Sequence, residues 1–142
     1  YSSAASDVYK RQVLNGAVKT TAECRALLDE VHDGVRIDGV MVGRAAYQTP
    51  WMLSEVDSVL YGESCRTLTR EAVIAAVEAE VEQYYAADEH VTRAFARHLN
   101  GLCQGLSGAR VWRRTLADPK IIKAEGPNLY RRAWREAFGT DF

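Results

Sequence analysis

The chain has 142 residues, of which 47% are apolar and 26% charged, and its formal net charge is −1. This composition is that of a folded protein and excludes a mainly disordered or fibrous chain. Its apolar runs are too short for a transmembrane helix, and no N-terminal stretch has the layout of a secretory signal. The length suits one or two small domains and is well below the about 250 residues of a complete (β/α)8 barrel.

Charge is divided unevenly along the chain. Residues 1–89 hold eight Lys or Arg against fifteen Asp or Glu, a net charge of −7. Residues 90–142 hold ten against four, a net charge of +6. The basic C-terminal third favours a polyanionic partner for that part, with an ordinary solvated helix face as the alternative.

The three cysteines, Cys24, Cys65 and Cys103, are scattered and form no Cys-x-x-Cys pair. That spacing disfavours a zinc site and a disulfide framework, and it predicts a reducing, cytoplasmic location. We expect each of them to be a small buried side chain and not a nucleophile.

The first twelve residues differ from everything that follows. They begin at Tyr1 instead of Met and show neither helical nor strand periodicity. The segment resembles the translation of a sequencing adaptor, so we interpret residues 1–12 as non-native. The native sequence is then expected to begin near Val13, in mid-strand, which predicts that the chain is a C-terminal fragment.

A strand, a turn and a helix are predicted first. Val13-Leu14 ends a strand at Asn15-Gly16, a pair typical of turns. Thr20 and Glu23 form a capping box at the start of a helix, which we expect to end at Asp33-Gly34. The apolar face of this helix is expected to comprise Ala22, Leu27, Leu28 and Val31.

A second unit of the same kind follows. A short strand over residues 37–42 has a continuous apolar run, typical of a parallel strand covered on both faces. Thr49 is expected to cap a later helix that has Pro50 at its first position and stops at Gly62. Two such units in succession are typical of the last strands of a (β/α)8 barrel.

Only helices are predicted from residue 63 onward. They span about residues 69–87, 91–102, 107–116 and 127–138. Thr69 and Ser107 are the expected N-caps, and Pro119 is expected to break the third helix. The predicted fold class is therefore α/β and then all-α: the last two β/α units of a TIM barrel (13–62), followed by a small helical domain (63–142).

A phosphate site is predicted where the two strands end. Gly16 and Gly43 lack a Cβ and let the backbone approach an anion closely, and Arg44 offers a bidentate guanidinium. Backbone N–H groups at such turns hold a phosphate well. In a (β/α)8 barrel both turns would lie on the same rim, where the loops after strands 7 and 8 often bind a phosphate.

Basic residues form a cluster in the sequence that comprises Arg93, Arg97, His98, Arg110, Arg113 and Arg114. Arg110, Arg113 and Arg114 are three and four residues apart, so one helix face presents all three to nucleic-acid phosphates. Trp112 lies between them and is expected either to stack on a base or to anchor the helix in the core. Other charged residues are interpreted as ordinary solvated surface: Glu78, Glu80, Glu82, Arg131, Arg132 and Arg135.

No catalytic or metal-binding motif is evident. The chain lacks His-Glu-x-x-His, Gly-x-Ser-x-Gly, a P-loop and the Rossmann glycine pattern. His32, His90 and His98 have no evident catalytic partners. We therefore predict neither a catalytic residue nor a metal site in this chain, so that any chemistry would require sequence outside it.

Two stretches resemble a known family. Asn15-Gly16 followed by VMVGRAAYQTP at residues 40–50 is similar to the last part of the barrel of tRNA-dihydrouridine synthases. RHLNGLCQG at 97–105 and SGARVWRR at 107–114 are similar to the helical tRNA-binding domain of the bacterial-type A subfamily. The resemblance covers essentially residues 13–138.

The resemblance implies a cytoplasmic, monomeric enzyme that uses FMN and NADPH to reduce the C5–C6 double bond of a D-loop uridine in tRNA. By analogy, the FMN phosphate would be held by Asn15, Gly16, Ala17, Gly43 and Arg44. The family usually has Gly where this chain has Ala17. Arg110 and Arg113 match positions that contact tRNA in the subfamily, and Arg114 lies beside them. The family's cysteine proton donor lies on an earlier loop and matches none of the three cysteines.

Two alternatives stay open on the sequence alone. Residues 63–142 could be a helical RNA-binding module without catalysis, or the chain could belong to another FMN-dependent TIM-barrel oxidoreductase. The second leaves the basic helix unexplained. Under the leading interpretation the 142-residue chain is inactive alone and does not bind FMN stably, because most strands of the barrel lie outside it.

Overall fold

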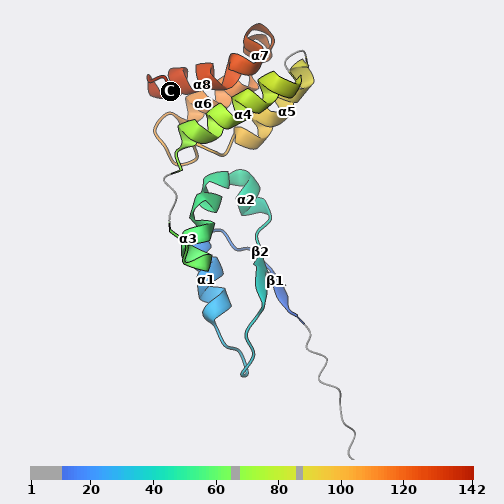
Figure 1. Ribbon diagram of the computed structural model, residues 1–142, viewed down its shortest axis with the longest axis vertical. Coiled ribbons are helices and arrows are strands. Elements are labelled where there is room, and N and C mark those ends of the chain that lie inside the picture. The colour runs from blue at the N-terminus through green and yellow to red at the C-terminus, as the bar shows by residue number, and fades with distance from the viewer. Residues whose placement is uncertain (1–10, 65–67, 86–87) are drawn as a thin grey trace, which may run out of the picture.

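The computed structural model describes residues 11–64, 68–85 and 88–142 and has two parts (Figure 1). Two parallel strands with their helices come first, and a mostly helical part follows. This confirms the predicted fold class. Cys65, Ala87 and residues 1–10 of the segment predicted to be non-native lie outside the described residues. Within those ranges no helix has both the length and the apolar character that crossing a bilayer requires.

The strands β1 (Val13–Asn15) and β2 (Gly39–Met41) pair in parallel, with Asn15 opposite Met41. The pairing continues one residue towards the N-terminus. The Gln12 N–H donates to the Asp38 carboxylate at 2.8 Å, and the Asp38 N–H donates to the Gln12 carbonyl at 2.8 Å. Gln12, at the end of the segment predicted to be non-native, therefore takes part in this pairing.

The strands are less covered than predicted. Val13 is 62% exposed, and Leu14 and Met41 are exposed as well. Within the described residues, helices lie on one side of the two strands (Figure 1). The expectation that the strand at residues 37–42 is covered on both faces is therefore wrong for this chain, because the described residues place no layer on the other side.

Helix α1 (Thr21–Asp29) begins as predicted and ends early. The Thr20 hydroxyl accepts the Glu23 N–H at 3.1 Å, and the Glu23 carboxylate accepts the Thr20 N–H at 3.3 Å, which confirms the capping box. Asp33 and Gly34 do not end this helix. Both have positive φ, and they form the turn between His32 and Val35, which pair as an isolated antiparallel bridge.

The buried face of α1 also differs from the prediction. Thr21 and Cys24 are its buried residues, whereas Ala22 is exposed and Val31 lies beyond the helix end. Leu27 and Leu28 are half-buried. The helix packs against α3, and the Arg25 guanidinium donates to the Leu60 carbonyl at 3.4 Å.

Three short helical segments follow β2: α2 (Arg44–Gln48), the 3-10 helix η1 (Pro50–Glu55) and α3 (Val56–Tyr61). Pro50 is at the first position of η1 as predicted, and Gly62 ends α3 with a positive φ of 68°. Thr49 does not cap η1 with its side chain. Its hydroxyl donates backwards to the Ala45 carbonyl at 2.9 Å, so Thr49 closes α2.

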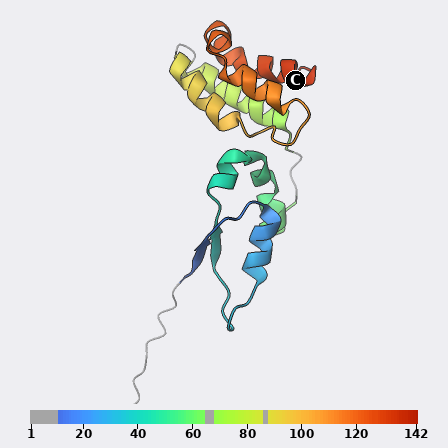
Figure 2. The same ribbon diagram turned by 180° about the vertical axis from the view of Figure 1, so that it is seen from behind.

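The helical part consists of five α-helices and one 3-10 turn within the described residues. They are α4 (Arg70–Tyr85), α5 (Glu89–Leu99), α6 (Ala109–Ala117), α7 (Pro119–Glu125), η2 (Gly126–Asn128) and α8 (Leu129–Phe138). Thr69 caps α4 as predicted, because its hydroxyl accepts the Ala72 N–H at 3.1 Å. Both views place α2 between the strands and the helical part (Figures 1 and 2).

The predicted start of the third helix is wrong, whereas Pro119 breaks that helix as predicted, because α6 ends at Ala117. Gly108, with φ 104°, precedes α6 and leaves Ser107 outside the capping position. Pro119 starts α7, a helix that the sequence patterns missed, because the Asp118 carboxylate accepts the Lys120 N–H at 2.8 Å and caps it. Proline fits the first turn of a helix, where its missing N–H has no partner to lose.

The core of the helical part is built around aromatic residues. Trp112 and Tyr130 are fully buried, and Trp112 meets Trp134 edge to face with 6.2 Å between ring centroids. The Trp112 indole N–H donates to the Leu99 carbonyl at 2.9 Å. Of the two roles expected for Trp112, the structure therefore supports the core anchor. It fixes α6 against the end of α5.

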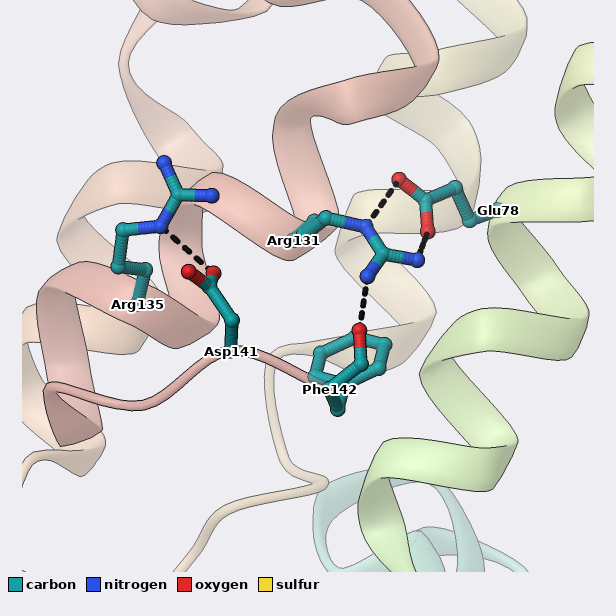
Figure 3. A network of polar contacts seen from close by, with 5 residues as sticks. All are labelled: Glu78, Arg131, Arg135, Asp141 and Phe142. Atoms are coloured by element: carbon teal, nitrogen blue, oxygen red, sulfur yellow. Dashed lines mark hydrogen bonds and ion pairs between the residues drawn. The ribbon is translucent and has the colours of Figure 1, made fainter.

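Charged residues predicted as plain surface form a network instead (Figure 3). Glu78 is only 6% exposed, and its carboxylate accepts a hydrogen bond from the Arg131 guanidinium at 2.8 Å. Arg131 also donates to the Phe142 carbonyl and lies over the Phe142 ring. Arg135 pairs with Asp141 at 2.6 Å. The solvated-face prediction is therefore wrong for Glu78, which joins α4 to α8.

Candidate functional site

The structure brings all five residues of the predicted phosphate site into one pocket of about 840 Å³. Its lining comprises Asn15, Gly16, Ala17, Val18, Lys19, Met41, Gly43, Arg44, Ala45, Gln48 and Thr49. The pocket lies where the two strands end. Because β1 and β2 are parallel, with Asn15 opposite Met41, the segments that follow them leave the sheet at the same edge.

In the loop that follows β1, several backbone N–H groups donate to acceptors of the protein itself. The Glu23 carboxylate accepts the N–H groups of Lys19 at 2.7 Å and Thr20 at 3.3 Å, and the Val18 N–H donates to the Gly16 carbonyl at 2.7 Å. The capping box therefore occupies the amides nearest α1. The backbone donors that this loop can offer to a ligand lie earlier, around Gly16 and Ala17.

The charge of the pocket is positive. Lys19 and Arg44 line it, and no Asp or Glu is among the lining residues. Arg44 is exposed and makes no ion pair within the described part of the chain. A guanidinium and an ammonium next to free amides suit a phosphate dianion. Lys19 was missed by the sequence patterns, although a cation directly after the Asn-Gly turn was a usable signal.

The two glycines of the pocket leave room for a ligand. A Cβ on Gly16 would meet only the Leu14 side chain, at 4.0 Å, and one on Gly43 would meet the Met41 sulfur at 3.5 Å. The described protein atoms therefore do not fill the space beside either backbone. The residues present fit a phosphate-bearing cofactor, with Ala17 adding one methyl group to the loop.

The predicted basic face is present on α6. Arg110, Arg113 and Arg114 are all exposed, while Trp112 is buried on the same helix. The helix therefore turns its apolar side to the core and its arginines outward. The Arg113 guanidinium donates to the Gln104 side-chain carbonyl at 2.9 Å.

A second pocket, of about 470 Å³, lies beside the first, where α2 meets α5 and the turn after it. It is lined by Tyr47, Gln48, Thr49, Arg97, Asn100, Gly101, Gln104 and Arg113. Gln48 and Thr49 line both pockets. Of the basic cluster predicted from the sequence, Arg97 and Arg113 line this pocket. The sequence patterns did not connect them with Tyr47, because that contact depends on how the two parts pack.

The described cysteines are buried as predicted. Cys24 and Cys103 are 3% and 0% exposed, and burial raises the pKa of the Cys103 thiol to about 11. Burial is also the main cause that raises the pKa of Cys24. Both thiols are therefore protonated and shielded near neutral pH. Among the described residues no group of three or more His, Cys, Asp or Glu side chains is arranged to hold a metal ion.

Comparison with known families identifies the chain at this point. Residues 11–138 match the family described as Dihydrouridine synthase (Dus). The chain belongs to the dihydrouridine synthase family. The family assignment agrees with the two β/α units and the helical part that follows them, which correspond to part of a Dus TIM-barrel region and its helical continuation.

Relatives of this dihydrouridine synthase chain carry the name tRNA-dihydrouridine(20/20a) synthase. The one from Shewanella oneidensis is 41% identical over 125 residues, which are 86% of this chain and 34% of the relative. The Pseudomonas putida relative is 39% identical over 118 residues, covering 81% and 32%. The Escherichia coli K12 relative is 37% identical over 105 residues, covering 74% and 28%. The chain thus spans about a third of the length of these relatives.

Proposed function

We propose that this chain is the C-terminal portion of a tRNA-dihydrouridine synthase of the A subfamily. Residues 13–62 would form the end of an FMN-binding barrel and residues 63–142 a tRNA-binding domain. The observation that supports this proposal most is that the five predicted cofactor residues line one pocket with two cations. Gln48 and Thr49 of the same lining also line a second pocket, whose walls come from both parts and include two arginines. The complete enzyme would be monomeric and cytoplasmic.

The strand-end pocket would hold the FMN phosphate. Lys19 and Arg44 neutralise its charge, and the amides around Gly16 and Ala17 donate to its oxygens. When bound, FMN supplies the hydride that it receives from NADPH and that reduces the C5–C6 bond of the uridine. The residues of this chain bind and orient the phosphate end, which fixes where the flavin ring can lie.

The helical part would hold the tRNA. Arg110, Arg113 and Arg114 face outward from a helix whose position is fixed by buried Trp112. Arginines on a rigid helix bind phosphates, and the attraction weakens with salt. The net charge of +6 on residues 90–142 has the sign that this role requires. The target uridine must be unstacked to reach a buried cofactor.

The proton donor of the reaction would lie outside this chain. Cys24 and Cys103 are buried and have raised pKa values, and neither lines the strand-end pocket. A thiol that protonates a base must reach that base, so neither of these two cysteines suits the role. Under the proposal the catalytic residue is supplied by the preceding part of the barrel.

The cofactor half of the proposal is tested by replacing Arg44 in the complete enzyme. Loss of a charge-assisted hydrogen bond to phosphate predicts that Arg44→Gln raises the Kd for FMN about tenfold or more. Arg36→Gln is the matched control, because Arg36 is exposed and does not line the pocket. FMN fluorescence titration measures both. If the two variants bind FMN with equal affinity, Arg44 is not part of the cofactor site.

A further inference from the structure

The pocket between α2 and the α5–α6 region is a fixed feature of the junction between the two parts. Gly101 lies against the backbone of Gln48 so closely that a Cβ there would be 2.0 Å from the Gln48 carbonyl oxygen and 3.0 Å from the Pro50 ring. This contact holds the end of α2 against the turn after α5. The pocket walls therefore come from both parts.

The pocket carries uncompensated positive charge. Arg97 is exposed and makes no ion pair within the described residues. Arg113 is bonded to Gln104, a neutral amide. No carboxylate is among the lining residues, whereas the similar-sized pocket around Arg132 on α8 contains Glu125 and Glu136. Two guanidinium groups facing one hollow suit an anion, and their planar donors match a phosphate.

An aromatic ring stands at the edge of the same pocket. Tyr47 is 55% exposed, and its ring meets His98 edge to face with 5.5 Å between centroids and 86° between planes. The contact with His98 holds the ring in place and leaves more than half of the side chain open. Proteins bind single-stranded nucleotides with exposed aromatic rings that lie next to arginines. The base stacks on the ring, and the arginines bind the phosphate.

We propose that this pocket binds one unpaired nucleotide of the RNA substrate, with its phosphate on Arg97 and Arg113 and its base stacked on Tyr47. The amides of Gln48, Asn100 and Gln104 are placed to hydrogen-bond the base edge or ribose. Because Gln48 and Thr49 line both pockets, the proposed nucleotide site adjoins the strand-end pocket. The inference rests on the proposed function and adds a subsite to it. An acidic peptide would supply the negative charge that suits this pocket, but it has no base that could stack on Tyr47.

The test uses the full chain and an unmodified tRNA transcript, with binding followed by fluorescence anisotropy at several salt concentrations. Arg97→Gln and Arg113→Gln should each weaken binding and reduce the salt slope by about one. Lys123→Gln is the matched control, because it removes one exposed cation that lines neither pocket. Tyr47→Phe keeps the ring and should bind like the original chain. Tyr47→Leu keeps apolar bulk without a stacking face and should weaken binding about fivefold or more.

The outcomes separate the subsite from the proposed function. If the original chain binds tRNA and both arginine variants behave like Lys123→Gln, the subsite is wrong and the tRNA-binding role stands. If Tyr47→Leu binds as well as Tyr47→Phe, or polyglutamate displaces tRNA as well as a short oligoribonucleotide does, the stacked base is wrong. If the original chain prefers tRNA no more than duplex DNA of equal length, the proposed function itself fails. Circular dichroism melting on each variant confirms that it is folded.

Discussion

At the level of single residues, Glu136 on α8 is held by donors from two sides. The Thr115 hydroxyl donates to one carboxylate oxygen at 2.7 Å, and the Arg132 guanidinium donates to the other at 3.0 Å. These hydrogen bonds, Thr115 first and Arg132 second, lower the pKa of Glu136 from its usual 4.5. Arg132 also bonds Glu125 at 2.5 Å, so the group joins α6, α7 and α8.

The lowered pKa of Glu136 predicts how stability depends on pH. Because the folded-state pKa lies below the unfolded one, the ionised carboxylate contributes stability that is fully present above its usual 4.5. That contribution is lost as the pH falls through the lowered folded value. Glu136→Gln should therefore reduce Tm at pH 7, and the difference from the original chain should shrink towards about pH 3.

Thermal melts across this pH range check the Glu136 prediction. Glu80→Gln is the control, because Glu80 is exposed on α4 and makes no ion pair within the described chain. It should leave the melting curve close to that of the original chain. A Glu136→Gln deficit of equal size at pH 3 and pH 7 would contradict the assignment of ionised Glu136 as the stabilising form.

At the level of elements, the contact between α2 and the turn after α5 decides how the two parts meet. A methyl group on Gly101 cannot fit without moving the Gln48 backbone. Gly101→Ala should lower the free energy of unfolding by about 1–3 kcal/mol, the usual cost of overpacking. It should also increase hydrogen exchange at α2 and η1, where the contact is released.

Gly16→Ala is the comparison for the Gly101 prediction. A Cβ on Gly16 meets nothing closer than 4.0 Å, so its effect on unfolding should be small. Urea denaturation and hydrogen exchange by mass spectrometry measure both variants. If Gly101→Ala exchanges like the original chain at α2 and η1, the two parts do not depend on this contact.

Some features of these elements could be predicted from local sequence patterns, and others could not. Thr20 and Thr69 were predictable as caps, because a cap depends on residues within one helical turn. The prediction that Ser107 caps α6 failed, because Gly108, with a positive φ, occupies the position directly before the helix. The prediction that Glu78 is solvated failed, because its burial depends on Arg131, which is 53 residues away in the sequence. The strand-end pocket was predictable from two parallel strands that end at one edge, whereas the place of Tyr47 in the second pocket depends on tertiary packing.

At the level of the whole molecule, two features agree. The first strand is open on both faces, because Val13 and Leu14 point to opposite sides and are both exposed, and the chain spans about a third of its relatives' length. Exposed apolar strand residues of this kind are normally covered by a further layer. Under the proposal, the rest of the barrel provides that layer together with the catalytic cysteine. The helical part has its own core around Trp112, Tyr130 and Trp134.

The most direct measurement of the central claim is dihydrouridine formation by a chimaera. The segment of the Shewanella oneidensis relative that matches this chain is replaced by residues 13–142, and the product is incubated with FMN, NADPH and unmodified tRNA. Mass spectrometry should detect dihydrouridine in the tRNA, and Arg44→Gln in the chimaera should reduce its rate at limiting FMN. A folded chimaera that holds FMN and forms no dihydrouridine would contradict the claim that this chain supplies the cofactor rim and the tRNA-binding part.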